Sequence, residues 1–595
     1  GGWLFGDGGA GWDSTTAGVG GGAGGAAGFF GNGGAGGEGG AGAAGGAGGA
    51  GGWLFGVGGH GGDGGDGVDG GNGGDGGDAT GLFGVGGDGG NGGDSGIGGS
   101  PVGLPALGGA GGNSGLIGSH GAVGDHGTDS TAPTPADDGL STTGGWLTDS
   151  DGKVVILHGL NQVYKVPPYE PSADGFGADD AAFLAANGFN AVRVGVIWAA
   201  VEPQPGVFNE AYLQSVEQTV QTLADHHIVS ILDFHQDLYN ELFQGEGAPD
   251  WAVQTGGLPN PAIGFPYNYF LNPAENHAWD AFWSNANAPD GVGLENNYAL
   301  AWEHVADYFK GNPDVAGYEI MNEPWPGSQW IPTLLGSHHF DAQQLTPFYN
   351  QVDSAIRAVD PNTPVFFEPN TLFNETTPTH LGTVDDPHAV FAFHDYCLAN
   401  AAFGIDFACS LTDKIILSNA AKYADAHDIP AFMTEFGATD NTNVIAQMLG
   451  QVNPYKFGWT EWAYTGNDIT SSSPNGQALV FDPSKPPVGD NVDTAKLATL
   501  AEPYPQLVAG TPNSWSFDNG TFTFSYSTEM AGGSGSFPAD SQTTISVPAV
   551  EYPNGYQVHV TGGHVFSDPP GPELIIASNP GADTVNVVVS PAGSG

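Results

Sequence analysis

The chain has 595 residues, and 65 Asp and Glu against 10 Lys and Arg give it a formal net charge of −55. All ten basic residues are scattered from Lys153 onward, so the Lys and Arg clusters needed to bind nucleic-acid phosphates are missing and nucleic-acid binding is excluded. The same deficit argues against docking on anionic lipid head groups. No run of about 18 apolar residues occurs, so the sequence predicts no transmembrane segment. It begins at Gly1 without the features of a signal peptide, which indicates a fragment or a processed product.

Residues 1–127 form a glycine-rich leader that holds more than half of the 103 glycines. Short apolar segments interrupt the glycine triplets at a fixed interval, because Phe5, Phe30 and Phe55 follow one another every 25 residues. Such a period indicates a repeat array in which every unit needs its neighbours to bury apolar surface. Triplets with two glycines suit extended helices of three residues per turn that pack side by side. The alternative is a disordered leader.

The composition and repeat pattern of this leader resemble those of the glycine-rich repeat region of the mycobacterial PE_PGRS proteins. That resemblance implies a protein that is secreted or held at the cell envelope or cell surface. One nonapeptide, residues 61–69, also fits a calcium-binding β-roll pattern. Residues 128–144 are dominated by Ser, Thr, Pro and Asp and predict a linker to the rest of the chain.

Residues 145–502 alternate short apolar runs with amphipathic stretches, as expected of strands and helices around a parallel sheet. Strands are predicted at residues 154–159, 191–198, 228–234, 315–321, 364–368, 390–394, 431–435 and 458–464, and helices at 210–226, 298–310, 345–359, 419–427 and 443–450. Eight such alternations predict an α/β fold of the (β/α)8 TIM-barrel type. In this fold the functional side chains stand at the C-terminal ends of the strands.

Residues 503–595 contain short alternating segments separated by Gly and Pro, which predict a small β-sandwich. We expect this domain to pack on the barrel, the alternative being a free carbohydrate-binding module. Cys397 and Cys409 are the only cysteines. Their spacing favours a short local disulfide, the alternative being two reduced, buried cysteines.

Two carboxylates stand at the ends of predicted barrel strands. Glu323 follows the fourth strand and Glu435 ends the seventh, and both ends of a closed barrel point at one central mouth. Glycosidic bond cleavage needs such a pair, with one carboxyl protonated and the other ionised. Arg193, one of two arginines, lies inside the apolar second strand and needs a buried partner. The sequence therefore predicts a polar catalytic pocket.

The motifs Asn322-Glu323-Pro324 and Glu435-Phe436-Gly437 resemble those of glycoside hydrolase family 5, retaining enzymes on a (β/α)8 barrel. With residues 234–237 and 318–327, they look most like its endoglycoceramidase branch, which cleaves glycans from ceramide. The resemblance implies that Glu323 is the acid/base and Glu435 the nucleophile. It implies substrate-binding roles for Arg193, which keeps Glu435 ionised, for Asn322 at the sugar 2-hydroxyl, for His235, Asp237, His394 and Tyr396 in the glycone site, and for Trp462 beneath the sugar. Tyr396 would also orient Glu435.

The charges near the two carboxylates predict different protonation. An arginine beside Glu435 should lower the pKa of that carboxyl. Glu323 has fewer positive charges nearby and should keep its proton near neutral pH. A double displacement of this kind needs no metal and no other cofactor.

Aromatic residues are dense at 251–283 and follow the acid/base motif at Trp325 and Trp330. Aromatic loops near a barrel mouth bind either sugar faces or an apolar aglycone, or pack on themselves. The aliphatic residues after Trp330 favour a lipid aglycone, so we predict a retaining β-glycosidase that acts on a glycolipid or another β-glycoside. The alternatives are a β-glucanase or cellulase-type polysaccharide hydrolase, and a catalytically silent glycan- or lipid-binding envelope protein. An open cleft would favour a polymer.

Overall fold

The computed structural model describes residue 4 and residues 6–66, 71–79, 83–93, 109, 111–113, 121, 139–396, 409–466, 474–533, 535–567 and 569–592. The chain divides into two units. The first comprises Gly1–Ala136, Ala281–Lys310 and Gln343–Pro361, and the second holds the remaining residues. None of the helices in the described ranges combines the length and apolar content needed to cross a bilayer.

The leader is an array of extended segments joined by main-chain hydrogen bonds at every third residue. The N–H of Gly8 donates to the carbonyl of Asn32, and the N–H of Gly11 donates to that of Ala35, both at 2.8 Å. The carboxylate of Asp7 adds a contact of the same period, since it accepts from the N–H of Asn32 at 2.8 Å. The predicted side-by-side array is therefore confirmed for the described residues, and disorder is the wrong alternative for them.

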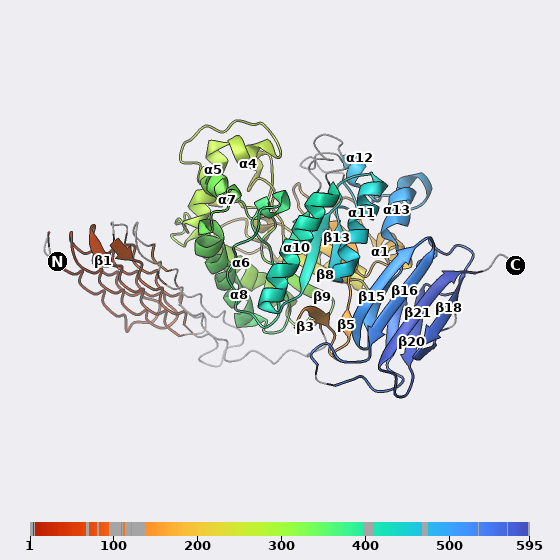
Figure 1. The fold of residues 1–595 in the computed structure, drawn as a ribbon. Coiled ribbons are helices and arrows are strands. Elements are labelled where there is room, and N and C mark those ends of the chain that lie inside the picture. Colours follow the sequence, from red (N-terminus) through yellow and green to blue (C-terminus); the bar gives the residue numbers. More distant parts are fainter. Residues whose placement is uncertain are drawn as a thin grey trace. The chain divides into compact units, whose positions relative to one another are not determined.

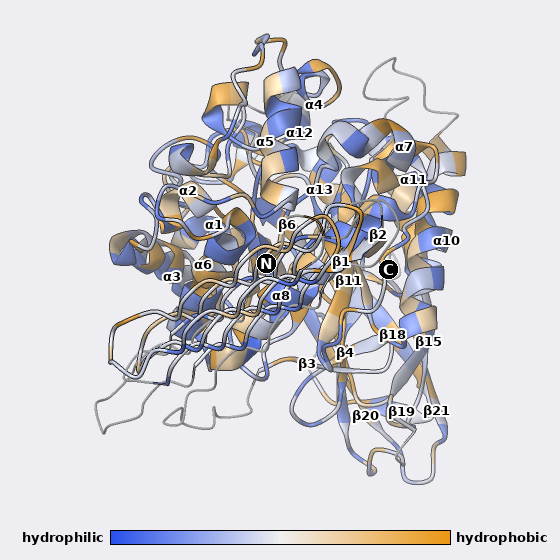
Figure 2. Cartoon of the chain, turned by 90° about the vertical axis from the view of Figure 1, so that its left-hand side faces the viewer, coloured by the Kyte–Doolittle hydropathy of each residue, from blue (hydrophilic) through white to orange (hydrophobic). Residues whose placement is uncertain are grey.

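Glycine is required where neighbouring segments touch. A Cβ atom on Gly34 would lie 2.1 Å from the carbonyl oxygen of Gly9, well inside the 3.0 Å that real Cβ contacts respect. The apolar side chains stack at the same 25-residue period. The ring centroids of Phe30 and Phe55 lie 6.1 Å apart, and the rings are nearly parallel. In Figure 2 the hydrophobic colour of these segments is strongest around β1 (Phe55–Val57) and β2 (Phe83–Val85), which pair in parallel. Phe5 and residues 67–69 of the nonapeptide lie outside the described residues.

Eight parallel strands close into a barrel in the second unit (Figure 1). They are β6 (His158–Gln162), β7 (Ala191–Val196), β8 (Val229–Phe234), β9 (Val315–Glu319), β10 (Val365–Phe367), β11 (Ala389–Asp395), β12 (Ala431–Phe436) and β13 (Gly458–Glu461). The strands follow the chain order around the barrel, and β13 closes it against β6. The predicted TIM barrel is confirmed.

The first strand was predicted wrongly. Residues 154–159 were expected to open the barrel, but Val154–Val155 form β5 of another sheet, and the barrel strand β6 begins at His158. The reason is burial of polar groups. Asn161 and Gln162 are fully buried within β6, so their polarity does not end the strand as the pattern suggested.

The helices of the described residues lie between the strands in sequence. The longer ones are α1 (Ala178–Ala186), α3 (Glu210–Ala224), α5 (Pro273–Trp283), α6 (Leu294–Phe309), α8 (Thr346–Val359), α10 (Cys409–His427), α11 (Thr442–Val452) and α13 (Thr494–Leu500). Shorter helices are α2 (Trp198–Val201), α4 (Tyr267–Leu271), α7 (Trp330–Leu334) and α12 (Pro474–Gln477), with a 3-10 helix η5 (Thr371–Glu375) after β10. All five predicted helices are present, although α10 starts ten residues before its predicted beginning at residue 419.

Two antiparallel sheets form the predicted C-terminal sandwich. The strands of the larger sheet are β3 (Ser141–Thr143), β4 (Trp146–Thr148), β5, β14 (Tyr504–Val508), β17 (Gln542–Ser546), β19 (Gly563–Val565) and β20 (Glu573–Ser578), and those of the smaller sheet are β15 (Thr511–Asp518), β16 (Thr521–Ser527), β18 (Tyr556–Thr561) and β21 (Thr584–Pro591). An apolar core lies between them, with Ile545 from one sheet and Phe524 from the other. β3 to β5 precede the barrel in sequence, and β3 occupies the end of the predicted linker.

The sandwich and the barrel share a continuous interface. β5 pairs with β14 directly before the chain enters β6, and the ring of His158 is stacked between Trp459 and Tyr504, with centroids 4.2 and 3.7 Å away. Burial holds the pKa of His158 well below its ordinary value, so the ring is neutral in this stack. The prediction of a packed structural domain, rather than a free binding module, is confirmed.

Replacing Tyr504 by Ala should destabilise the enzyme by about 3–5 kcal/mol, because a large buried ring is lost from this interface. Tyr504 is 2% exposed and also donates a hydrogen bond to the carbonyl of Gly188 at 2.9 Å. Urea denaturation measures the change. Phe566→Ala, at a site 60% exposed on the sandwich, is the control that should change stability little. Equal effects of both changes would contradict an integral interface.

Cys409, at the start of α10, is in a disulfide. The other cysteine of the sequence, Cys397, lies outside the described residues. The alternative of a reduced, buried Cys409 is therefore wrong.

Candidate active site

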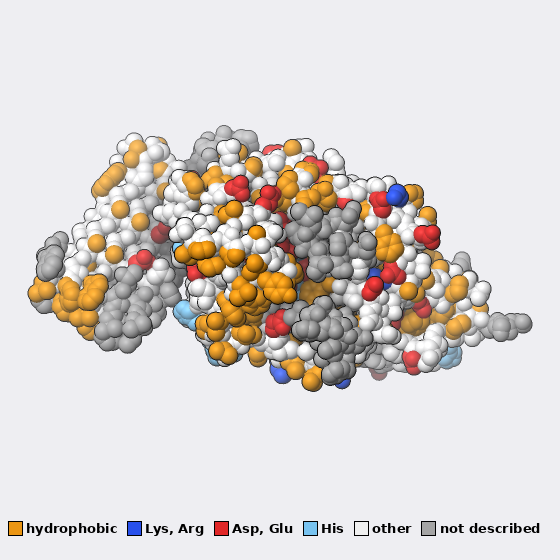
Figure 3. Space-filling model, turned by 90° about the horizontal axis from the view of Figure 1, so that it is seen from above, with side chains coloured by type: hydrophobic (Ala, Val, Ile, Leu, Met, Phe, Trp, Pro, Cys, Tyr) orange, Lys and Arg blue, Asp and Glu red, His pale blue; other side chains and the backbone are white. Residues whose placement is uncertain are grey.

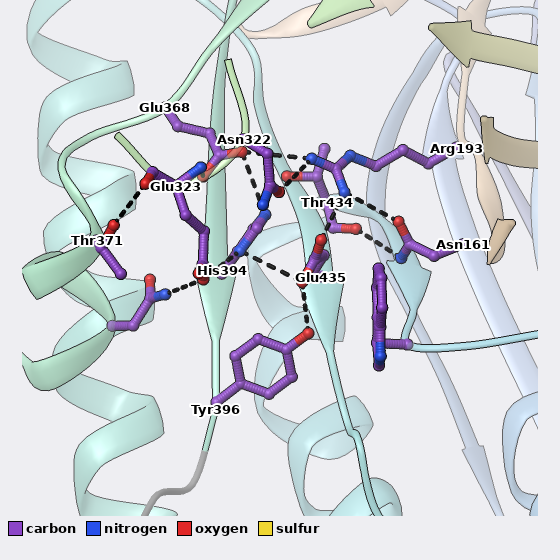
Figure 4. A network of polar contacts seen from close by, with 12 residues as sticks. Asn161, Arg193, Asn322, Glu323, Glu368, Thr371, His394, Tyr396, Thr434 and Glu435 are labelled. Atoms are coloured by element: carbon purple, nitrogen blue, oxygen red, sulfur yellow. Dashed lines mark hydrogen bonds and ion pairs between the residues drawn. The ribbon is translucent and has the colours of Figure 1, made fainter. Parts of the chain in front are cut away.

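The predicted site residues meet at the C-terminal end of the barrel. Arg193 comes from β7, His394 from β11 and Glu435 from β12, while Glu323 follows β9. Figure 4 shows these side chains converging with Asn322 and Tyr396 in one network of polar contacts. Neighbouring parallel strands point their ends at the same mouth, which is why residues more than 100 positions apart come together.

Glu323 and Glu435 face each other across His394. One oxygen of each carboxylate and Nδ1 of His394 all lie within 4.8 Å of one another. Nδ1 is 2.9 Å from Oε1 of Glu323 and 3.5 Å from Oε2 of Glu435. In glycosidases, carboxyl groups about 5–5.5 Å apart serve a retaining double displacement, whereas about 6.5–9.5 Å leaves room for the water of an inverting reaction. The close spacing fits the retaining geometry.

Arg193 is the buried cation at the centre of the site. It is fully buried and contacts four carboxylates: Glu319 and Glu435 at 2.5 Å, Asp233 at 3.1 Å and Glu368 at 3.4 Å. Burial opposes its charge, but these carboxylates more than offset burial and raise the pKa of Arg193 well above its ordinary value. The predicted pairing of Arg193 with Glu435 is confirmed, and the guanidinium organises a wider network than expected.

Glu435 is held at both oxygens. Arg193 donates to Oε1, and the hydroxyl of Tyr396 donates to Oε2 at 2.5 Å. Asn322 is fixed in turn, since its Oδ1 accepts from Arg193 at 2.8 Å and its Nδ2 donates to the carbonyl of Gln236 at 2.9 Å. These bonds leave the nucleophile candidate little rotational freedom.

The sequence predicted a lowered pKa for Glu435 and a proton retained on Glu323, and this order is wrong. Burial raises the pKa of Glu435, although His394 and Arg193 act in the opposite direction. Burial acts in the same way on Glu323, but the hydrogen bond and charge of His394 outweigh it and hold the pKa of Glu323 below its ordinary value. Neither the depth of burial of Glu435 nor the contact between His394 and Glu323 can be read from sequence spacing.

A second polar cluster adjoins the first. His235 stacks on Trp462 with centroids 5.4 Å apart, and its Nδ1 lies 2.7 Å from Asp233, which also contacts Arg193. Lys165 pairs with Asp237 and lies 4.3 Å above the centroid of the Trp462 ring. The structure therefore brings His235, Asp237 and Trp462 together, and it adds a buried lysine that the sequence did not single out.

Several site residues escaped the sequence analysis: Asn161, Lys165, Asp233, Glu319, Glu368, Thr371, Asn374 and Thr434. The sequence did contain a signal for the acids, because Asp233 and Glu319 lie inside predicted apolar strands and Glu368 ends one. A buried acid in such a run needs a cation, and Arg193 was the obvious candidate. No comparable signal marked Asn374, which lies in a connecting segment.

Three groups of side chains carry atoms that metal ions accept: His235 with Asp237 and Glu246, Glu319 with Glu368 and His394, and Glu323 with His394 and Glu435. A basic side chain of the chain itself is in contact with each group. Lys165 lies by the first, and Arg193 contacts Glu319, Glu368 and Glu435 of the other two. The positive charge that these carboxylates need is thus supplied by protein.

An apolar surface adjoins the site. α4 and α7 pack on each other through Phe270, which lies 5.2 Å from Trp330, and leave Leu271 and Leu335 exposed at 64% and 81%. Residues 251–274 and 324–340 contain no Asp, Glu, Lys or Arg. Figure 3 shows hydrophobic side chains gathered on the face seen from above, over the region of α4, α5 and α7. We use the name apolar apron for the exposed side chains of α4 and α7 with Leu335.

Family comparisons match three parts of the chain. The model described as Cellulase (glycosyl hydrolase family 5) matches residues 148–468, and the glycoside hydrolase family 5 C-terminal domain matches residues 503–589. PGRS repeats match residues 1–54. The cellulase model alone spans more than half of the chain, and the C-terminal-domain model lies on the part of the β-sandwich that follows the barrel in sequence.

Characterised relatives share most of their length with this chain. Endoglycoceramidase I of Rhodococcus hoagii is 32% identical over 474 residues, which are 76% of this chain and 89% of the relative. An endoglycoceramidase of Hydra vulgaris is 29% identical over 446 residues, 70% of this chain and 81% of the relative.

Solved structures agree with this similarity. Endo-glycoceramidase II from a Rhodococcus species aligns with a TM-score of 0.64 at 30% identity, over 75% of this chain and 100% of that one. The same enzyme in complex with ganglioside GM3 aligns with a TM-score of 0.62 at 28% identity, over 77% and 100% of the two chains.

Proposed function

The chain belongs to glycoside hydrolase family 5, and from this premise we propose that it is a retaining β-glycosidase that releases the glycan of a glycolipid from its lipid aglycone. The observation that carries the proposal is the close approach of Glu323 and Glu435 at one barrel mouth, with an oxygen of each within 4.8 Å. This spacing suits a covalent intermediate and leaves no room for an inverting water.

We assign Glu435 as the nucleophile and Glu323 as the acid/base. The reacting form is the fraction of enzyme in which Glu323 carries a proton and Glu435 is ionised, since the pKa of Glu323 is lowered and that of Glu435 is raised. In the first step Glu435 attacks the anomeric carbon while Glu323 gives its proton to the glycosidic oxygen, whose bond to the sugar breaks with both electrons remaining on that oxygen. The lipid alcohol leaves, and the glycan stays on Glu435. In the second step water passes a proton to Glu323, and its oxygen displaces Glu435 from the sugar. Arg193 and Tyr396 stabilise the carboxylate of Glu435 before attack and after release.

The remaining assignments follow from position. Asn322, held by Arg193 and the carbonyl of Gln236, takes the sugar 2-hydroxyl. His235, Asp237 and Trp462 form the glycone site beside it, together with Lys165. A charged and aromatic cluster of this kind suits a hydroxyl-rich sugar ring, because it offers both hydrogen bonds and a stacking face.

A lipid aglycone is supported by the apolar apron and by the relatives. Of the two apron helices, α7 starts a few residues after Glu323, and both α4 and α7 lie in segments without Asp, Glu, Lys or Arg. Side chains such as Leu271 and Leu335 offer nothing to a second sugar but suit a hydrocarbon chain. The similar proteins include endoglycoceramidases, one of them solved in complex with a ganglioside.

Incubation with lactosylceramide tests this proposal. We expect lactose and free ceramide as products, detected by mass spectrometry, with little release of single sugars from the glycan end. Steryl glucosides and soluble β-glucans are assayed alongside. Preferred cleavage of β-glucan would favour the polysaccharide hydrolase instead. If neither lipid, polymer nor aryl β-glycoside were cleaved, the chain would be a glycan- or lipid-binding protein.

We further propose that the leader holds the enzyme at the cell envelope. Residues 1–54 match PGRS repeats, and the repeats expose aromatic side chains, with Trp53 and Phe55 exposed at 66% and 48%. Exposed aromatic side chains such as these suit contact with lipid or another apolar surface. Replacing both by Ser in the full chain should move enzyme from the envelope fraction of expressing cells to the medium. An unchanged distribution would contradict this role.

A further inference from the structure

Three residues of the segment after β10 form hydrogen bonds with Glu323, the acid/base candidate. Nδ2 of Asn374 donates to Oε1 of Glu323 at 2.7 Å, and the hydroxyl of Thr371 donates to the carbonyl of Glu323 at 2.7 Å. The N–H of Glu323 donates to Oε2 of Glu368 at 3.3 Å. Glu368 directly follows β10, and Thr371 and Asn374 lie on η5. Figure 4 shows Glu368 and Thr371 beside Glu323.

The main chain of Glu323 needs such support. Its φ is +44°, in the left-handed region of the backbone, which residues other than glycine adopt at a cost of about 1–3 kcal/mol. Both of its main-chain polar groups are fixed, the N–H by Glu368 and the carbonyl by Thr371 and by Nε2 of Gln236 at 2.9 Å. The strained conformation is therefore determined by contacts outside β9, and it sets the direction in which the carboxyl points.

The two oxygens of Glu323 are not equivalent. Oε1 lies within hydrogen-bond distance of two nitrogens, Nδ2 of Asn374 at 2.7 Å and Nδ1 of His394 at 2.9 Å. The amide of Asn374 can only donate at this nitrogen, and a positively charged His394 donates as well. An oxygen that already accepts two hydrogen bonds is a poor place for an acid proton. Oε2 has no hydrogen-bond partner among the described residues.

We propose that Asn374 is a positioning residue of the acid/base, and that together with His394 it reserves Oε1 as an acceptor so that Oε2 of Glu323 carries the catalytic proton. This inference rests on the proposed function. In the first step the proton on Oε2 passes to the leaving oxygen, and in the second the proton of water returns to Oε2. Glu368 and Thr371 act on the same group through its main chain.

Leaving groups of different acidity test the role of Asn374. A dinitrophenyl β-glycoside departs without protonation, whereas an alkyl β-glycoside needs the proton of Glu323. We expect Asn374→Ala to lower kcat/KM by about 10- to 100-fold for the alkyl glycoside, as the loss of a hydrogen bond to a charged group predicts. The dinitrophenyl glycoside should change by less than about threefold. An equal loss for both substrates would overturn the proposal, because a merely structural role gives that result.

The pH profile gives a second readout. Asn374 donates to the carboxylate and favours its ionised form, so its loss should raise the pKa of Glu323 and move the basic limb of kcat/KM to higher pH. Asn374→Asp places a like charge beside Oε1 and should move that limb further in the same direction. An unmoved limb in both variants would contradict the inference. Asn443→Ala, at an exposed site on α11, is the matched control and should leave profile and rates unchanged.

Failure of this inference is distinguishable from failure of the proposed function. If the unaltered enzyme cleaves both glycosides and Asn374→Ala does not separate them, only the role of Asn374 is wrong. If the unaltered enzyme cleaves neither glycoside, the assignment of Glu323 and Glu435 is wrong, and the role of Asn374 falls with it. Thermal unfolding of each variant shows whether a loss of activity comes from a loss of folded protein.

Discussion

Replacing Glu435 by Gln should lower kcat by at least about 10⁴-fold on any β-glycoside, the scale seen when a catalytic nucleophile is removed. The amide keeps the shape of the carboxyl but cannot form the covalent intermediate. Arg193 would then face a neutral group in place of the carboxylate to which it now donates at 2.5 Å. Rates of aryl β-glycoside hydrolysis measure the loss. A residual activity within tenfold of the parent would contradict the assignment of Glu435.

A trapped intermediate identifies the nucleophile directly. Incubation with a 2-fluoro β-glycoside that carries a good leaving group should leave the fluorosugar on Glu435, located by mass spectrometry of the digested enzyme. Glu323→Gln is the matched control, because it should still form the adduct from an activated substrate that departs without a proton. An adduct on any other residue, or none in the unaltered enzyme, would rule out the mechanism.

The sequence was sufficient to predict the architecture because most strands of the barrel follow the expected apolar patterns. Seven of the eight barrel strands were predicted within a few residues, since runs such as 191–198 and 431–435 are largely apolar. The exception was β6, where burial of Asn161 and Gln162 hid the strand. The contribution of β3 to β5 to the sandwich could not be foreseen, because pairing between strands more than 300 residues apart leaves no local signal.

The site was predictable where strands carry it. Both carboxylates and Arg193 stand on or directly after barrel strands, so the fold alone brings them to one mouth. The contacts made by connecting segments were not predictable, and Lys165 and Asn374 are the clearest cases. Protonation was the least predictable property. It depends on burial and on which side chain lies within about 3 Å, and neither quantity is fixed by spacing along the chain.

Replacing Arg193 by Lys should lower kcat/KM at neutral pH by about 10²- to 10³-fold, the usual cost of losing a preorganised donor at a charged centre. A single ammonium cannot reproduce the fork of Arg193, which reaches Glu319 on one side and Glu435 on the other. Glu435 would lose part of the positive charge that opposes burial, so its pKa should rise further. Since the nucleophile must be ionised, the acid limb of the pH profile should move to higher pH.

Arg193→Met separates the structural from the catalytic part of this effect. Removing the charge leaves Asp233, Glu319 and Glu368 buried without their shared cation, and such a loss destabilises by about 3–5 kcal/mol. Urea denaturation should show that loss in Arg193→Met and a smaller one in Arg193→Lys, which keeps a positive charge. An acid limb that stays in place in folded Arg193→Lys would contradict the proposed control of Glu435. The two variants together therefore test whether one guanidinium both stabilises the barrel mouth and keeps the nucleophile ionised.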